Sequence, residues 1–280
     1  MTVDIIIVNW NGGPELVAAV RSALRAGGRP IVVDNASVEN VALREVAQMP
    51  GVSVVQQPTN VGFAAGCNSG VRAGSGDVVM LLNPDAEIVE GTAVDVELAL
   101  STSGAMMVGT RLEDAAGTQV PALRAFPGTI DLIADLMRIH SLRSRLTQRE
   151  QWSFKPRAAA GQKGWIVGAA LALRRSDWDR LGGMDEGFFL WYEDVDLGVR
   201  VSRLGGAVAI ADTVLIRHLG ASTWNRLTRR RRQWLRVRGA LRFARRDLGW
   251  PAVASVVAVA LPAVAIGAGL DVVHWLTRRP

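Results

Sequence analysis

The sequence predicts an α/β protein with a mostly parallel sheet flanked by helices. Over residues 4–82, short β-rich runs alternate with segments of helical period in the order β-α-β-α-β-α-β, the pattern of a parallel sheet. Of the 280 residues, 49% are apolar and 21% are charged, which excludes a disordered or collagen-like chain. The one cysteine, Cys67, cannot form an internal disulfide, which is typical of a reducing compartment.

Four strands and three helices are expected in the first half of the chain. Pro14 begins the first helix, because proline is tolerated in a first turn, and Gly27 and Gly28 end it. We expect strands over residues 4–8, 30–33, 52–56 and 77–82, and helices over 14–26, 38–49 and 63–73. Ligands of open parallel sheets bind beyond the carboxyl ends of the strands, so the loops there are the predicted site.

The second half of the chain has a less regular pattern. We expect strands over residues 106–110, 165–173, 208–210 and 214–216, and a helix over 129–146. Another helix is expected to begin at Glu193, where acidic side chains occupy a first turn, as the helix dipole favours.

Charge divides the chain into a slightly acidic body and a strongly basic C-terminal part. Residues 221–280 contain twelve arginines and two aspartates, a net charge of +10, whereas the first 220 residues contain 20 basic and 24 acidic residues, a net charge of −4. Such a segment favours an anionic partner, either a membrane or a nucleic acid. The uncharged stretch 251–270 favours the membrane, because a nucleic-acid-binding protein has no use for it.

Three units are therefore expected: a catalytic domain over residues 1–220, a basic amphipathic helical segment over 221–250, and a hydrophobic membrane-associated segment over 251–280. The stretch 251–270 is long enough for one span, and Pro262 also permits a kinked hairpin. Trp224, Trp234, Trp250 and Trp275 lie in or beside these segments, as interfacial tryptophans do. Residues 1–10 lack a basic leader, so we expect the body at the cytoplasmic face of the membrane.

Two acidic residues follow predicted strands. Asp85 in Asn83-Pro84-Asp85 can hold Mg²⁺ or Mn²⁺ on a substrate diphosphate, because hard cations prefer oxygen ligands. The same tripeptide is also common in turns. Asp34 ends the second strand, where an acid can bind a nucleotide, although a turn aspartate is the alternative.

A glycine stripe marks the third helix. Gly62, Gly66 and Gly70 recur every four residues, which permits close approach of either a ligand or the sheet, and Asn68 offers amide hydrogen bonds between them.

The run from Phe188 to Leu197 places Glu193, Asp194 and Asp196 at a helix start. A carboxylate there can act as the general base for a sugar hydroxyl, and helix capping is the alternative explanation. His218 can be a neutral ligand of the same cation, or a structural histidine.

These residues, taken together, resemble family 2 glycosyltransferases, and most closely a bacterial rhamnosyltransferase-like branch that uses dTDP-rhamnose. The resemblance covers residues 3–220 and rests on the order of its motifs. The motifs are Val8-Asn9-Trp10-Asn11, Val33-Asp34-Asn35-Ala36-Ser37, Asn60-Val61-Gly62-Phe63 with Asn68, Asn83-Pro84-Asp85, Gly168 with Arg174-Arg175, Gly182-Gly183-Met184-Asp185-Glu186 and Glu193-Asp194-Val195-Asp196-Leu197-Gly198.

The resemblance implies a GT-A nucleotide-diphospho-sugar transferase fold and an inverting mechanism. Asp194 would be the base, with Glu193 as the second candidate, and Asp85 and His218 would hold a divalent cation. Asn83 replaces the first aspartate of the usual D-x-D-like motif, so Asp85 would hold the cation with less help. The residues expected to bind the nucleotide-sugar are Asn9, Trp10, Asp34, Asn68, Asn83 and Asp85, and those expected to bind the acceptor are Gly168 and Trp191.

The resemblance further implies a nucleotide-diphospho-sugar donor and a polyprenyl-diphosphate-linked glycan acceptor at a membrane, in cell-wall or surface polysaccharide synthesis, with no nucleic-acid partner. Three alternatives stay open at this point: a hexosyl- or galactosyltransferase that uses a UDP-sugar, a non-catalytic sugar-nucleotide binder, and a nucleic-acid binder that uses Arg229–Arg232 and Trp234.

Overall fold

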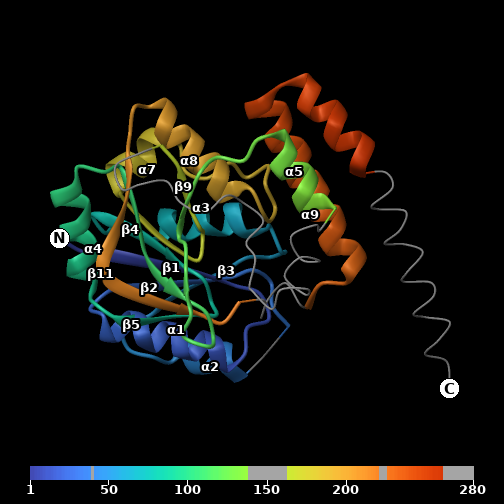
Figure 1. Cartoon of the computed structure of the whole chain (residues 1–280). Coiled ribbons are helices and arrows are strands. Elements are labelled where there is room, and N and C mark those ends of the chain that lie inside the picture. Colours follow the sequence, from blue (N-terminus) through green and yellow to red (C-terminus); the bar gives the residue numbers. More distant parts are fainter. Residues whose placement is uncertain (39–40, 138–162, 221–225, 261–280) are drawn as a thin grey trace, which may run out of the picture.

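A computed structural model describes residues 1–38, 41–137, 163–220 and 226–260. Within these residues the chain forms a mixed nine-stranded sheet with helices on both faces (Figure 1). The strand order is β3-β2-β1-β4-β10-β6-β11-β5, with β7 beside β6. The strands are β1 (Val3–Asn9), β2 (Arg29–Asp34), β3 (Ser53–Gln56), β4 (Val78–Leu82), β5 (Ala86–Glu90), β6 (Met107–Glu113), β7 (Gln119–Val120), β10 (Ala170–Arg174) and β11 (Val208–His218).

The first half of the sheet is parallel, as predicted. β2 and β4 flank β1 in parallel, and β3 pairs with β2 in the same direction. All seven residues of β1 are buried. The run Ile5–Val8 within it is apolar without alternation, as in strands that are covered on both faces. The helices between these strands are α1 (Pro14–Arg25), α2 (Val41–Ala47) and α3 (Phe63–Ala73).

The second half departs from the predicted pattern. The expected strand over residues 165–173 is two strands, β9 (Trp165–Ile166) and β10, and β9 pairs with β8 (Leu123–Arg124) in a separate small sheet. β10 runs antiparallel to β4 and β6, so the sheet is mixed. The two short strands expected near residues 208 and 214 form the single strand β11, with a register shift between Ala211 and Leu215.

Two elements carry no clear periodic pattern. β5 is short and contains two glutamates. α4 (Ala93–Ser103) has apolar residues on every side, and Val94 and Leu98 remain exposed. Its start is fixed by a capping box between Thr92 and Asp95, which is a local signal independent of the apolar pattern.

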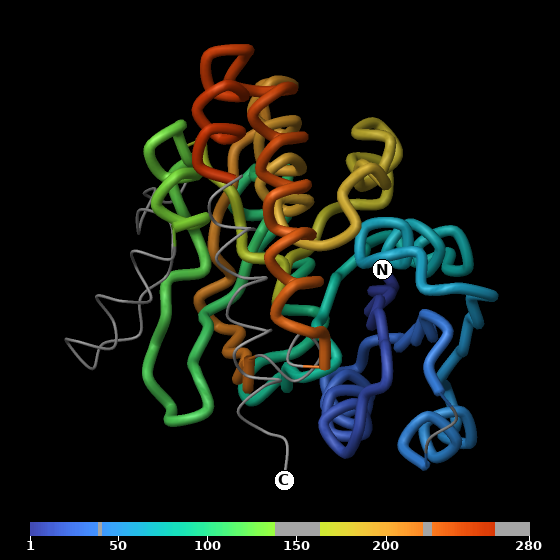
Figure 2. The backbone as a smooth tube through the Cα atoms, turned by 90° about the vertical axis from the view of Figure 1, so that its right-hand side faces the viewer, coloured from blue at the N-terminus to red at the C-terminus, as the bar shows by residue number. Residues whose placement is uncertain are grey.

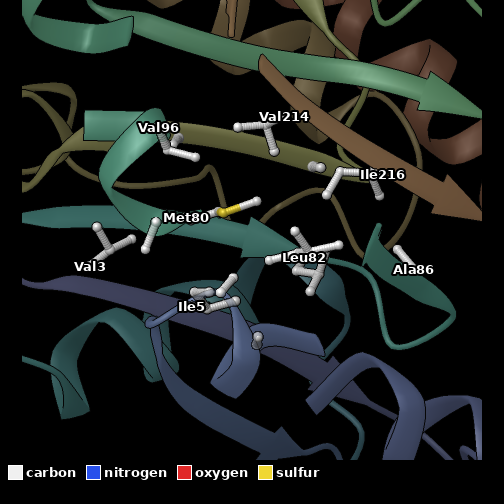
Figure 3. Packing of buried hydrophobic residues seen from close by; sticks show 14 of the residues in the cluster. Val3, Ile5, Met80, Leu82, Ala86, Val96, Val214 and Ile216 are labelled. Carbon is white, nitrogen blue, oxygen red and sulfur yellow. The ribbon is translucent and has the colours of Figure 1, made fainter. Parts of the chain in front are cut away.

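Helices cover the two faces of the sheet with separate apolar clusters. On one face, α1 and α4 pack against the sheet, and Ile5, Met80, Leu82 and Ile216 share that cluster with Val96 of α4 (Figure 3). On the other face lie α3, α7 (Arg175–Leu181) and α8 (Glu193–Arg203).

The glycine stripe of α3 is explained by packing against the sheet. A Cβ atom on Gly66 would lie 2.8 Å from Val8 Cγ1, and one on Gly70 would lie 2.4 Å from Ile6 Cγ2. Of the two explanations left open by the sequence, close approach of the sheet therefore accounts for these two positions.

A third cluster joins the body to the basic segment. It unites α5 (Thr129–Leu136) and the aromatic run before α8 with α9 (Arg229–Phe243), the π-helical turn η2 (Ala244–Leu248) and the helical residues 250–260. Figures 1 and 2 both place α9 beside α5. The expected helix over 129–146 is described only as far as Leu136, and residues 138–146 lie outside the described part.

Within the described residues, no helix is both long and apolar enough to cross a bilayer. Of the apolar stretch 251–270, only residues 251–260 belong to that part, so the expected span lies half outside it.

Candidate active site

A cavity of about 710 Å³ opens where the loops after β1, β4 and β11 meet the start of α8. Most of the predicted site residues line it, namely Trp10, Asn83, Asp85, Gly168, Trp191, Glu193, Asp194 and His218. Asp85 and Asp194 are far apart in the sequence and share this cavity. A second cavity of about 640 Å³ lies beside α1 and α2 and contains none of the predicted site residues.

Asp85 and His218 lie side by side because β5 and β11 pair. Ala86 of β5 is opposite His218, the last residue of β11. His218 Nε2 lies 3.2 Å from Asp85 Oδ1 and 3.2 Å from Asn83 Nδ2. The structure therefore brings together the three residues that the sequence assigned to the diphosphate and cation side of the site.

The donor atoms here suit a hard divalent cation. A carboxylate oxygen and an imidazole nitrogen are ligands that Mn²⁺ accepts, and Mg²⁺ keeps water and phosphate oxygens in most of its positions. Across residues 1–38, 41–137, 163–220 and 226–260, no group of three or more His, Cys, Asp or Glu side chains is arranged to hold a metal. Asp85 and His218 thus fit a cation whose other ligands come from the substrate diphosphate and water.

The break between β9 and β10 connects the two acidic loops. The Gly168 N–H donates to Asp194 Oδ2 at 2.9 Å. The adjacent Ala169 carbonyl accepts a hydrogen bond from the Asn83 N–H, also at 2.9 Å. A Cβ on Gly168 would lie 3.3 Å from Asp194 Oδ2, a close contact with the same carboxylate. Gly168, expected to bind the acceptor, thus also positions the base candidate.

Glu193 and Asp194 have different environments at the start of α8. Asp194 Oδ1 accepts a second backbone hydrogen bond, from the Val195 N–H at 2.9 Å. Burial raises the pKa of Asp194, and the Gly168 and Val195 N–H groups and the Arg124 charge oppose that rise. Burial and the Asp194 charge raise the pKa of Glu193 well above its ordinary value, and its Oε2 accepts no hydrogen bond within the described residues. Of the two acids, Asp194 therefore has the surroundings that better support a charged carboxylate.

Asn9 and Asp34 do not line this cavity. Both are buried, and Asn9 Nδ2 donates to Asp34 Oδ1 at 3.0 Å and to Ser37 Oγ at 3.2 Å. This network fixes the loops after β1 and β2. The next residue, Asn35, lines the cavity instead, although its own amide also bonds the Gly62 carbonyl at 2.9 Å.

Asn68 has a structural role in place of the expected ligand contact. Its Nδ2 donates to the Met184 carbonyl at 2.8 Å and to Glu186 Oε1 at 2.9 Å, and its Oδ1 accepts from the Met184 N–H at 2.8 Å. These bonds join α3 to the loop before α8. Two residues of the motif Gly182–Glu186, Met184 and Glu186, thus form hydrogen bonds with Asn68.

Sequence reasoning missed several cavity residues from outside the main sheet. They include Arg124 of β8, Trp165 of β9, Asp135 of α5 and Arg236 of α9. Arg124 is buried, and its guanidinium Cζ lies 5.5 Å from the centroid of the Trp165 ring. Burial lowers the pKa of Arg124 to about 10, and the Asp194 charge opposes that shift. No periodic pattern marked the segment around Arg124. In α9, by contrast, apolar residues recur at helical spacing, and this pattern could have predicted that the helix packs against the rest of the protein.

The comparisons with known proteins agree with this geometry. A family model described as glycosyltransferase-like family 2 matches residues 2–261, so the chain belongs to this glycosyltransferase family. The resemblance stated from the motifs is confirmed.

Curated relatives of this chain include named glycosyltransferases. The chain is 27% identical over 242 residues to the N-acetylglucosaminyl-diphospho-decaprenol L-rhamnosyltransferase of Mycobacterium tuberculosis, covering 78% of this chain and 76% of the relative. It is 24% identical over 204 residues to the low-salt glycan biosynthesis hexosyltransferase Agl10 of Haloferax volcanii, covering 71% of this chain and 61% of the relative. Glycosyl transfer is therefore the activity of the class.

Solved structures confirm the expected GT-A fold. GalNAc-T7 with UDP, GalNAc and Mn²⁺ superimposes with a TM-score of 0.57 at 17% identity, over 78% of this chain and 44% of that one. The mannosyltransferase PcManGT from Pyrobaculum calidifontis, with GDP-Man and Mn²⁺, has a TM-score of 0.55 at 18% identity, over 97% of this chain and 75% of that one. The chain thus spans less than half of GalNAc-T7. At these identities the likeness concerns the fold alone.

Glu193 makes the stability of the protein depend on pH. Because its folded pKa is raised, the folded state holds a proton that the unfolded state loses above about pH 4.3, so stability falls as the pH rises through this window. Glutamine cannot ionise. We expect Glu193→Gln to match the parent melting temperature near pH 4 and to exceed it increasingly toward pH 8.

Thermal unfolding followed by circular dichroism across this pH range measures the effect. The matched control is Glu97→Gln on α4, outside the cavity. A constant difference between Glu193→Gln and the parent at every pH would contradict the raised pKa.

Proposed function

We propose that the protein is an inverting glycosyltransferase that moves a sugar from a nucleotide-diphospho-sugar to a hydroxyl of a lipid-linked glycan. The observation that carries the proposal is the shared cavity of Asp85 and Asp194. An inverting transfer needs a base on one side of the anomeric carbon and a site for the leaving diphosphate on the other. This pair provides both.

The base step belongs to Asp194. Its carboxylate accepts the proton of the acceptor hydroxyl, whose oxygen forms the new bond to the anomeric carbon as the bond to the diphosphate breaks. The Gly168 and Val195 N–H groups support the ionised form of Asp194. A bound divalent cation at Asp85 and His218 would offset charge on the diphosphate. The raised pKa of Glu193 favours its neutral form beside the charged base.

Other cavity residues divide between donor and acceptor. We assign Trp10 and Asn83, which follow β1 and β4, to the nucleotide-sugar, with Asn9 and Asp34 holding their loops in place. We assign Trp191 and Gly168, which lie beside Asp194, to the acceptor.

We propose rhamnose from dTDP-rhamnose as the transferred sugar and a polyprenyl-diphosphate-linked glycan as the acceptor, in cell-wall synthesis. The Mycobacterium relative is an L-rhamnosyltransferase of an N-acetylglucosaminyl-diphospho-decaprenol, which supports rhamnose as the sugar and a polyprenyl-diphosphate-linked acceptor. The Haloferax hexosyltransferase supports a hexose as the alternative sugar, for which we propose a UDP-sugar donor.

We also propose that residues 1–220 form the catalytic unit and that residues 221–250 and 251–280 hold it at the cytoplasmic face of the membrane. Residues 226–246 contain no acidic residue. Arg230, Trp234 and Arg238 are exposed at four-residue spacing on one side of α9, and Trp250 is 72% exposed. Exposed arginines and tryptophans at this spacing suit an anionic lipid surface.

A donor panel tests the catalytic proposal. We expect nucleotide release from dTDP-rhamnose with a lipid-linked acceptor and Mn²⁺. Asp194→Asn should lose about 10²–10⁴-fold in kcat while it retains nucleoside-diphosphate binding, because general-base catalysis contributes on that scale. Asp85→Asn should weaken nucleoside-diphosphate binding in Mn²⁺, whereas Glu97→Gln should change neither quantity.

The outcomes of this panel are distinct. Release from UDP-hexose alone would support the hexosyltransferase alternative, and nucleotide binding with no release from any donor would support a non-catalytic binder. NMR of the product should show an inverted anomeric configuration, and retention would exclude direct displacement.

A vesicle assay tests the membrane proposal. Each arginine near an anionic surface contributes about 1 kcal/mol of binding, so the triple variant Arg230→Gln, Trp234→Ala, Arg238→Gln should bind anionic vesicles more than ten-fold more weakly than the parent. Co-sedimentation with phosphatidylserine vesicles measures this change. Arg21→Gln on α1 is the control for a loss of surface charge. Retention on DNA together with no affinity for the vesicles would favour the nucleic-acid alternative.

A further inference from the structure

The turn that presents Asp194 has an unfavourable backbone conformation. Trp191 has a φ of 68° and Tyr192 a φ of 73°, both in the left-handed region. Within the described chain only two other non-glycine residues, Asn11 and Ala36, have a positive φ, and they do not adjoin each other. Such residues cost about 1–3 kcal/mol each and persist only where surrounding contacts enforce them. Asp194 follows Tyr192 by two residues, so the backbone of this turn fixes where α8 begins and therefore where Asp194 lies.

Gly239 of α9 lies directly against this turn. A Cβ atom on Gly239 would lie 2.9 Å from the Trp191 carbonyl oxygen and 3.0 Å from Tyr192 Cδ2. The first of these is a backbone atom, which cannot move without changing the turn. Arg236, one helical turn earlier, places its guanidinium Cζ 5.1 Å from the centroid of the Trp191 ring. α9 thus contacts both the backbone and the side chain of the turn.

Tyr192 is held from two sides. Its ring stacks on Phe243 of α9, with centroids 5.9 Å apart and planes at 26°. Its hydroxyl donates to Asp135 Oδ2 of α5 at 3.0 Å, and Arg236 Nε lies 3.7 Å from the same oxygen. Tyr192 and Phe243 are both buried. Contacts from α9 and α5 therefore enforce the positive φ of Tyr192.

The inward side of α9 differs from its outward side. Gly239, Ala240 and Phe243 are buried against the turn and the rest of the third cluster, while Arg230 and Arg238 are exposed. Membrane binding requires only the exposed side. The close approach of Gly239 to the turn is a separate feature.

We propose that α9 is a positioning element of the active site, and that Gly239 is its positioning residue. The helix holds Trp191 and Tyr192 in the conformation that directs Asp194 into the cavity. This role goes beyond the proposed function, because it gives the basic C-terminal segment a part in the transfer step that does not depend on lipid. It rests on Asp194 being the base.

Gly239→Ala tests the proposal in the full-length protein, assayed in detergent without vesicles. The added methyl must displace the turn or α9, and small displacements of a catalytic group cost on the order of 10²-fold in rate. We expect kcat to fall by about that factor. Affinity for a nucleoside diphosphate with Mn²⁺, measured by calorimetry, should stay within about two-fold of the parent, because Asp85 and His218 lie on other elements. A purely structural defect would lower both.

Two variants support the interpretation. Gly128→Ala at the start of α5 is the matched control, since its Cβ would find only Asp131 Oδ2, at 3.7 Å, and it should leave kcat unchanged. Phe243→Leu removes the ring that stacks on Tyr192 and keeps an apolar side chain, and it decides the question if Gly239→Ala does not fold. We expect it to lower kcat about ten-fold, again with nucleotide affinity retained.

The proposal is overturned if folded Gly239→Ala, or Phe243→Leu in its place, keeps the parent kcat. It is also overturned if kcat and nucleotide affinity fall in parallel. Failure of the proposed function gives a different result, because the parent protein itself would then show no turnover with any donor.

Discussion

The arrangement of the site depends on two hydrogen bonds made by neighbouring backbone groups. The Gly168 N–H holds Asp194, and the Ala169 carbonyl holds the loop of Asn83 and Asp85. Because these groups belong to adjacent residues, the distance between the two loops is fixed by a single peptide segment. That segment lies where the chain leaves the small β8–β9 sheet and enters the main sheet as β10. The antiparallel strand β10 thus has a direct functional consequence.

The same segment gives two adjacent acids different properties. Glu193 is buried and Asp194 is half-buried. Asp194 accepts backbone N–H hydrogen bonds on both of its carboxylate oxygens, whereas Glu193 Oε2 accepts none within the described residues. Hydrogen bonds to a carboxylate favour its charged form, whereas burial favours the neutral form. These opposing effects favour a neutral Glu193 beside a charged Asp194, an arrangement that avoids two negative charges at adjacent positions. The turn before α8, which contains Trp191 and Tyr192, also packs against α9. The buried side of α9 is apolar and its exposed side is basic.

Much of the first half of the fold is readable from the sequence, and the reasons are local. β1 to β4 are short apolar runs separated by helices. The first of these helices, α1, has clear limits, because Pro14 marks its start and the glycines after it mark its end. The antiparallel direction of β10 was not predictable, because strand direction depends on distant partners. The hydrogen bond between Asn68 and Met184 also joins residues 116 positions apart, so it was not predictable from local sequence either. The motif pattern alone indicates a ligand contact for Asn68. Asp85, Asp194 and His218 were predicted from residue type and motif order, and they line the cavity, whereas Arg124 and Arg236 were recognised as cavity residues only from the tertiary structure.

A crystal structure with a nucleoside diphosphate and Mn²⁺ tests the central claim most directly, because anomalous scattering locates the ion without reference to the protein. We expect the ion bonded to Asp85 and to the diphosphate inside the cavity, with the Asp194 carboxylate facing it across the space for the sugar. A nucleotide bound elsewhere, or an ion out of reach of Asp85, would contradict the account.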